Sequence, residues 1–126
     1  MRVLLDTHML LWALARPARL PTAARKQIEA ADVYVSAASI WEISIKSSLG
    51  TIDISSADVL AAVAPAGFSM LAISGEHAAH VANLPALHKD PFDRILVAQA
   101  LIEPMILLTN DDAMRPYGPF VVIAAA

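Results

Sequence analysis

The 126-residue sequence contains no cysteine, only four glycines and few charged residues. The absence of cysteine excludes a disulfide-stabilised secreted fold and any zinc site built on thiolates. Charged residues make up 17% of the chain, against roughly 25% in an average soluble domain. Hydrophobic residues make up 57%. We therefore expect some apolar surface to stay uncovered by this chain alone and to be buried in a homodimer or by a protein partner.

Long apolar runs are missing as well. No segment approaches the roughly 18 apolar residues of a membrane span. Asp6 and His8 interrupt the apolar N-terminal stretch that would otherwise resemble a signal peptide. We expect a cytoplasmic protein without a membrane span. The net charge of −3 and the pI near 5.7 argue against broad electrostatic wrapping of nucleic acid, although they allow a small basic patch.

Short apolar segments alternate with helical patterns along the chain. These segments lack polar alternation, which is typical of strands in a parallel sheet covered on both faces. The expected strands are Arg2–Leu5, Val33–Val35, Ser69–Ile73, Met105–Leu108 and Phe120–Ile123. Helices are expected from Thr7 to before Pro17, from Thr22 to Ala30, from Ser36 to Gly50, from Ser56 to Ala64, from Gly75 to about Asn83 and from Asp90 onward, with a short turn at Asp111–Met114.

This alternation predicts an α/β fold: a single domain over residues 1–126 with three layers, α/β/α, around a central, mainly parallel sheet. In such sheets ligands bind outside the carboxyl ends of the strands. Four acids fall at junctions near this edge. Asp6 follows the first strand, Glu42 lies early in the helix after the second strand, Asp93 opens a helix, and Asp111 follows the fourth strand. We expect these four carboxylates to converge.

Helix capping offers another explanation for some acids. Asp90, followed by Pro91 and Asp93, fits an N-cap with a capping box, and we interpret Asp90 in this way. Asp93 precedes a helix that is apolar nearly all round, so its first turn is expected to enter the end of the sheet. Asp6 ends a buried strand, where a carboxylate needs donors or a cation.

Glu42 has two structural alternatives to a chemical role. Ser39 stands three residues before it, which fits a capping box, and Lys46 stands four residues after it, which fits a surface ion pair. Both alternatives stay open at this point.

Converging carboxylates repel one another by roughly 4 kcal/mol per close pair at an effective dielectric constant of about 20. A cation is therefore needed, and oxygen ligands suit Mg²⁺ or Mn²⁺. His77 and His80 share a helix face, but no third ligand is evident and we do not expect zinc. His8 and His88 flank the acidic edge and are candidate substrate contacts.

Four segments carry a family resemblance: VLLDTHMLLWAL, VSAASIWEISIKSSLG, LHKDPFDRILVAQA and LLTNDDAMRPYG. In this order, and over essentially the whole chain, they resemble PIN domains, specifically the VapC-type toxins of bacterial toxin–antitoxin pairs. The resemblance implies a Mg²⁺- or Mn²⁺-dependent endoribonuclease that hydrolyses RNA phosphodiester bonds. It further implies a homodimer that a cognate antitoxin protein silences.

Carried over onto this chain, the resemblance implies that the catalytic residues are Asp6, Glu42, Asp93 and Asp111. The metal ligands would be Asp6, Asp93 and Asp111, and the hydroxyls of Thr7 and Thr109 would support them. Because Asp112 directly follows Asp111, the choice between these two as the fourth acid stays open.

Basic and aromatic residues provide further candidates. Lys46, Arg94 and Arg115 are candidate contacts of RNA phosphates, with ordinary surface charge as the alternative. Trp12 and Trp41 fall on apolar helix faces, which predicts packing in the core or in an interface rather than stacking on bases.

Two other functions fit an α/β domain with acids at one edge. A Mg²⁺-dependent phosphoacceptor signalling domain needs paired acids after the first strand and an aspartate after a middle strand. Here Asp6 stands alone and SMLAISG supplies no acid. A catalytically silent PIN-like module that binds RNA or protein is the other alternative, and the complete acid set argues against it.

Overall fold

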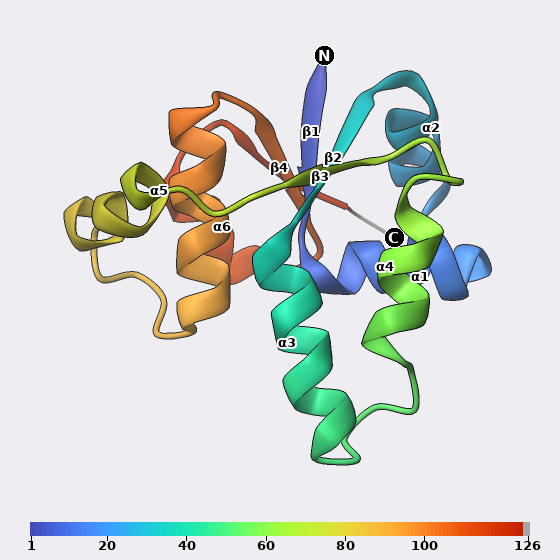
Figure 1. Cartoon of the computed structure of the whole chain (residues 1–126). Coiled ribbons are helices and arrows are strands. Elements are labelled where there is room, and N and C mark those ends of the chain that lie inside the picture. Colours follow the sequence, from blue (N-terminus) through green and yellow to red (C-terminus); the bar gives the residue numbers. More distant parts are fainter. Residues whose placement is uncertain (125–126) are drawn as a thin grey trace.

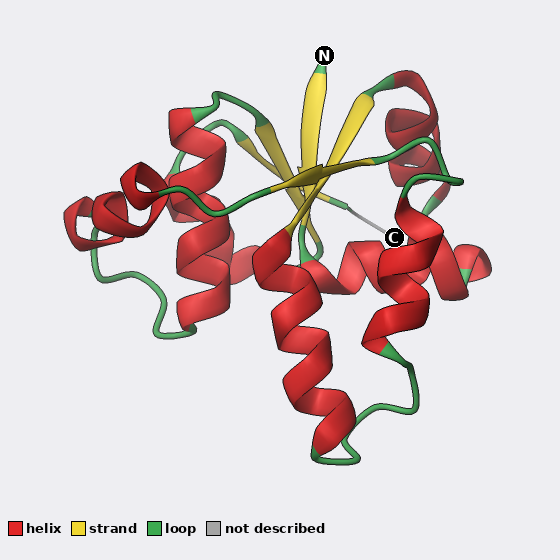
Figure 2. Ribbon diagram, viewed as in Figure 1, coloured by secondary structure: helices red, strands yellow, loops and turns green. Residues whose placement is uncertain are grey.

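The apolar segment Arg2–Leu5 forms β1, the central strand of a five-stranded parallel sheet (Figures 1 and 2). The computed structural model describes residues 1–124. The strand order is β3-β2-β1-β4-β5, and every neighbouring pair is parallel. The remaining strands are β2 (Asp32–Ser36), β3 (Ser69–Leu71), β4 (Ile106–Thr109) and β5 (Val121–Ile123).

Helices cover both faces of this sheet, so the predicted three-layer α/β/α fold is confirmed (Figure 2). The α-helices are α1 (Thr7–Ala15), α2 (Thr22–Ala30), α3 (Ala37–Ser48), α4 (Ser56–Val63), α5 (Gly75–His80) and α6 (Pro91–Ile102). Three 3₁₀ helices are η1 (Pro17–Arg19), η2 (Val81–Asn83) and η3 (Asp112–Tyr117). No helix within residues 1–124 combines the length and apolar character needed to cross a bilayer.

The sequence-based boundaries are close to the observed ones. The third strand ends at Leu71 instead of Ile73, because Leu71 makes the last pair with β2 before that strand leads into α3. The predicted helix to Asn83 divides into α5 and η2, and the short turn after Asp111 is a 3₁₀ helix that continues to Tyr117.

Side chains of the central strands alternate between two cores. Val3 and Leu5 pack into a core shared with α1 to α4, whereas Leu4 packs into a second core shared with α6. All three are fully buried. This alternation follows from the two-residue period of a strand, and it explains why β1 must be apolar throughout. Helix α6 is buried over five consecutive residues, Leu96 to Ala100, as its sequence predicted.

The three central strands end within one residue of one another. Leu5 pairs with Val35 of β2 and with Leu108 of β4. β1 ends at this pair, whereas β2 and β4 each continue for one residue that pairs with an outer strand. A polar side chain caps the helix that follows each strand. Asp6, Ser36 and Asp111 are these caps, and they accept hydrogen bonds from the backbone N–H groups of Met9, Ala38 and Ala113.

Leu108 of β4 is fully buried in the first core, which generates a stability prediction. Leu108→Ala should lower the free energy of unfolding by about 2–5 kcal/mol, because the cavity cannot collapse between sheet and helices. Leu101→Ala is the matched control, since Leu101 lies 41% exposed on α6 and alanine favours helix. Urea unfolding followed by circular dichroism measures both variants. Equal losses would contradict the placement of Leu108 in the core.

Candidate functional site

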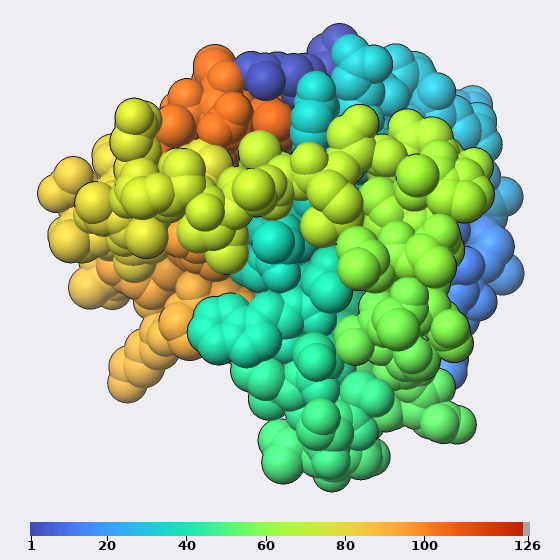
Figure 3. Space-filling model, viewed as in Figure 1, coloured from blue at the N-terminus to red at the C-terminus, as the bar shows by residue number. Residues whose placement is uncertain are grey.

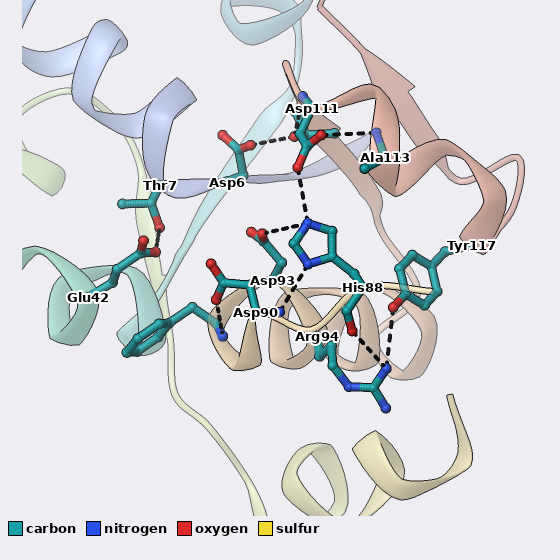
Figure 4. Close-up of polar contacts among 12 residues, drawn as sticks. Asp6, Thr7, Glu42, His88, Asp90, Asp93, Arg94, Asp111, Ala113 and Tyr117 are labelled. Atoms are coloured by element: carbon teal, nitrogen blue, oxygen red, sulfur yellow. Dashed lines mark hydrogen bonds and ion pairs between the residues drawn. The ribbon is translucent and has the colours of Figure 1, made fainter. Parts of the chain in front are cut away.

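A pocket of about 410 Å³ opens at the carboxyl ends of the central strands. Its lining contains all four acids that the sequence predicted to converge (Figure 4). The lining residues are Asp6, Thr7, His8, Glu42, Lys46, His88, Asp90, Asp93, Asn110 and Asp111. Topology has thus brought together residues that are up to 105 positions apart, from Asp6 to Asp111.

Asp6 is held on both of its carboxylate oxygens. Oδ1 accepts the backbone N–H of Met9 at 2.8 Å, and Oδ2 accepts the hydroxyl of Thr109. The same Thr109 hydroxyl accepts the backbone N–H of Asp111 at 3.1 Å, so it links two of the acids. Burial raises the pKa of Asp6, and these hydrogen bonds only partly counteract the effect.

Glu42 is buried, and its two oxygens also have partners. Oε1 accepts the hydroxyl of Thr7 at 2.7 Å, and Oε2 lies 2.8 Å from Nζ of Lys46. The predicted ion pair is therefore confirmed. The predicted capping box with Ser39 is wrong, because Ser36 caps α3 and the Ser39 hydroxyl lies 3.1 Å from that of Thr7. The hydrogen bond to Glu42 raises the pKa of Lys46, which stays charged.

Asp90 and Asp93 have different environments at the start of α6. Asp90 is the N-cap, as predicted, and accepts the backbone N–H of Phe92 at 2.9 Å. The predicted capping box is not formed, because the N–H of Asp90 donates to His88 and not to Asp93. The Asp93 carboxylate faces the pocket. Burial, and then the nearby Asp90 charge, raise its pKa to about 7.

His88 lies at the centre of the acidic cluster (Figure 4). Its Nε2 is 3.2 Å from Oδ2 of Asp111 and 3.5 Å from Oδ2 of Asp93. One potential ligand atom from each of these three residues lies within 4.8 Å of the others.

The charges of this lining fit a divalent cation. Five carboxylates line the pocket, and Lys46 is the one lysine or arginine among the lining residues that the structure describes. Lys46 is paired with Glu42, so it does not neutralise Asp93 or Asp111. Burial raises the pKa values of Asp6 and Asp93, and the charges of neighbouring acids add to the effect. Carboxylate oxygens are the ligands that Mg²⁺ and Mn²⁺ prefer.

Arg94, a candidate phosphate contact, does not line this pocket. Its guanidinium donates to the backbone carbonyls of Val81 at 3.0 Å, Pro85 at 3.1 Å and His88 at 3.4 Å. These donors are used to fasten the segment that precedes α6. Arg94 therefore holds the backbone that carries His88.

Asp112 and Arg115 lie outside the pocket. They are exposed and form an ion pair with each other, with 2.9 Å between Nη2 and Oδ1. Asp111 lines the pocket and caps η3, so Asp111 is the better candidate for the fourth acid. The candidate role of Arg115 as a phosphate contact stays a prediction.

The remaining candidates have structural environments. His77 accepts the N–H of Ser74 at its Nδ1 and places Nε2 2.6 Å from Oε2 of Glu103, so a helix end and an acid engage both ring nitrogens. Trp12 packs against the first core, as predicted. Trp41 is 60% exposed, so it is not a core residue, and its ring meets Phe92 edge-on at 5.1 Å.

Comparison with known proteins assigns this arrangement to a family. The sequence model of the PIN domain matches residues 3–118. The chain belongs to the PIN domain family. Membership of this family argues against the alternative of a phosphoacceptor signalling domain. No curated protein matches the sequence.

Solved structures share the fold of this PIN domain at low sequence identity. One is described as VapBC2 from Rickettsia felis bound to a DNA fragment from their promoter. The match has 14% identity and a TM-score of 0.70, and covers 98% of this chain and 97% of that chain. Another is a toxin–antitoxin complex from Klebsiella pneumoniae, with 20% identity, a TM-score of 0.69 and 98% of each chain covered. At such identities the likeness shows the fold alone.

Within this PIN domain, His88 is the residue whose contact with two acids the sequence did not indicate. The sequence put it beside the acidic edge, as one of two histidines that flank it. Its contact with two acids depends on a hydrogen bond from the N-cap of α6 and on the Arg94 contacts. The available signal was its position two residues before that N-cap.

The raised pKa of Asp93 predicts that the metal-free PIN domain loses stability as the pH rises. The folded protein keeps this proton up to about pH 7, whereas the unfolded chain releases it near the ordinary value of 3.8. Between these values the folded state binds more protons, so the free energy of unfolding falls with increasing pH. Asp93→Asn should reduce that fall and give a higher Tm than the wild type at pH 8 in EDTA.

Thermal denaturation from pH 4 to pH 8 checks this prediction. Asp53→Asn is the control, because Asp53 is exposed and lies away from the pocket. A wild-type pH dependence in the Asp93→Asn variant would contradict the prediction.

Proposed function

We propose that this PIN domain is a Mg²⁺- or Mn²⁺-dependent endoribonuclease and the toxin of a toxin–antitoxin pair. The observation that carries the proposal is the convergence of Asp6, Glu42, Asp93 and Asp111 on one pocket. Buried carboxylates without a counter-charge are costly, and a divalent cation removes that cost while it attracts the phosphates of RNA.

The protein residues of this pocket hold and orient the reacting groups. Asp93 and Asp111 would hold the cation, and Asp6 lines the same pocket on the side of β1. When bound, the cation supplies charge for the phosphate oxygens and lowers the pKa of water for in-line attack. Glu42, fixed by Thr7, is the remaining acid. No side-chain nucleophile is then required.

Lys46 and His8 are the proposed contacts of RNA beside the acids. Lys46 has 39% of its side chain exposed, and its raised pKa keeps it charged for a phosphate. His8 lines the pocket and is exposed. One lysine is a small basic patch, which suits a short segment of single-stranded RNA better than a broad nucleic-acid interface.

An apolar stripe on α3 supports the proposal of a protein partner. Trp41, Ile45 and Leu49 are 60%, 38% and 74% exposed, and their spacing of four residues places them on one side of the helix. Figure 3 shows that α3, in teal, lies open on this side of the molecule. We propose that a cognate antitoxin or a second copy of the chain covers this stripe, as the named components of the two solved complexes suggest. An RNA target and such a partner imply activity in the cytoplasm.

The first functional prediction concerns cleavage. Protein purified free of any antitoxin should cleave RNA with Mg²⁺ or Mn²⁺, and EDTA should stop the reaction. Asp6→Asn and Asp93→Asn should lower the rate by about 100-fold or more, because each removes charge where the cation binds. Asp90→Asn should retain most activity, because asparagine also caps helices. Gel analysis of labelled RNA measures the rates, with circular dichroism as the folding control. Equal losses in all three variants would overturn the division between chemical and structural acids.

The second functional prediction concerns toxicity. Expression of the chain in bacteria should arrest growth, and co-expression of the small gene next to its own should relieve the arrest. Asp6→Asn should not arrest growth, because the variant keeps its helix cap but loses a charge from the pocket. Growth curves at matched protein levels provide the measurement. Arrest that persists with Asp6→Asn would require a mechanism other than cleavage.

A further inference from the structure

The hydrogen bonds of His88 determine which of its ring atoms carries a proton. The backbone N–H of Asp90 donates to Nδ1 at 3.1 Å, and a backbone N–H can only donate. Nδ1 is therefore unprotonated, and the proton of the neutral imidazole lies on Nε2.

The protonated Nε2 faces the two acids that are proposed to hold the cation. It lies 3.2 Å from Oδ2 of Asp111 and 3.5 Å from Oδ2 of Asp93 (Figure 4). A protonated ring nitrogen has no lone pair for a metal. His88 therefore lies next to the proposed cation site, but with a proton on Nε2 it cannot coordinate the cation.

The place of the ring is set by the surrounding structure. Arg94 donates to the carbonyl of His88 and to those of Val81 and Pro85, which fastens the whole segment before α6. The side chain of His88 is 19% exposed and is anchored at both ring nitrogens. Its contact with the two acids is thus a feature of the fold and not a chance orientation of a surface side chain.

We propose that His88 takes the place of the divalent cation in the metal-free protein. Its Nε2–H holds Asp93 and Asp111 together and competes with the cation for these two carboxylates. Asp93 lies on α6 and Asp111 follows β4, so two separate elements bring their charges together. A donor between the carboxylates offsets their repulsion. A cation bound by the same two oxygens must displace the imidazole, so His88 lowers the affinity for the cation. This inference rests on the proposed cation site.

Two substitutions separate the two hydrogen-bonding functions of His88. His88→Asn keeps an acceptor for the N–H of Asp90, but its side chain is too short to reach the carboxylates. His88→Gln keeps an N–H donor near the position of Nε2 but has no acceptor at the position of Nδ1. With Mn²⁺ alone as the probe, and free Mn²⁺ measured by electron paramagnetic resonance, His88→Asn should bind about tenfold more tightly than the wild type. His88→Gln should bind like the wild type.

A second measurement follows the ring itself. Proton–nitrogen NMR spectra of the metal-free wild type should show His88 with its proton on Nε2, and addition of Mg²⁺ should shift this resonance. His77 is an internal reference, because it has the same hydrogen-bonding pattern at Ser74 and Glu103 and does not line the pocket. Its resonances should stay unchanged.

Three outcomes would overturn the inference in different ways. Weaker Mn²⁺ binding by His88→Asn, with nitrogen hyperfine coupling in the wild-type Mn²⁺ complex, would make His88 a ligand. Equal affinity of all three proteins would show that His88 does not compete, and it would leave the proposed cation site intact. The absence of Mn²⁺ binding by all three would overturn the cation site and with it the proposed function.

Discussion

The nearly level ends of three parallel strands are the constraint on which the rest of the site depends. Because Leu5 pairs with both Val35 and Leu108, β1, β2 and β4 end within one residue of one another. The helices that begin there have free N–H groups, which need polar caps. Acidic side chains meet this need and gather at one edge. The requirement of the fold for caps and the requirement of the site for carboxylates are therefore met by some of the same residues.

This double use has an electrostatic cost that the protein only partly offsets. Thr109 connects Asp6 with the backbone of Asp111, and Lys46 neutralises Glu42, but burial still raises the pKa values of Asp6 and Asp93. Ionisation of these buried carboxylates therefore lowers the stability of the folded protein. Free energy stored in this way becomes available to any guest that brings positive charge.

Much of this arrangement could be predicted from the sequence, because it depends on local patterns and on one rule of topology. Unbroken apolar segments predicted the strands, and the rule that ligands meet the carboxyl ends of parallel strands predicted the convergence of Asp6, Glu42, Asp93 and Asp111. Positions set by tertiary contacts were not predictable. Arg94 turns to backbone carbonyls, Trp41 stays exposed, and His88 reaches two acids only because a distant arginine fixes its backbone.

The cap at Asp6 has an evolutionary consequence. Asparagine accepts the same backbone hydrogen bond as aspartate, so a chain with asparagine at this position would remain folded while the pocket loses a charge. A duplicated gene with that change would encode a protein whose outer surface, including the stripe on α3, is unaltered. Such a copy would keep the surface by which the domain meets other molecules, while its pocket would carry less negative charge. The fold therefore lets the surface and the charge of the pocket change independently.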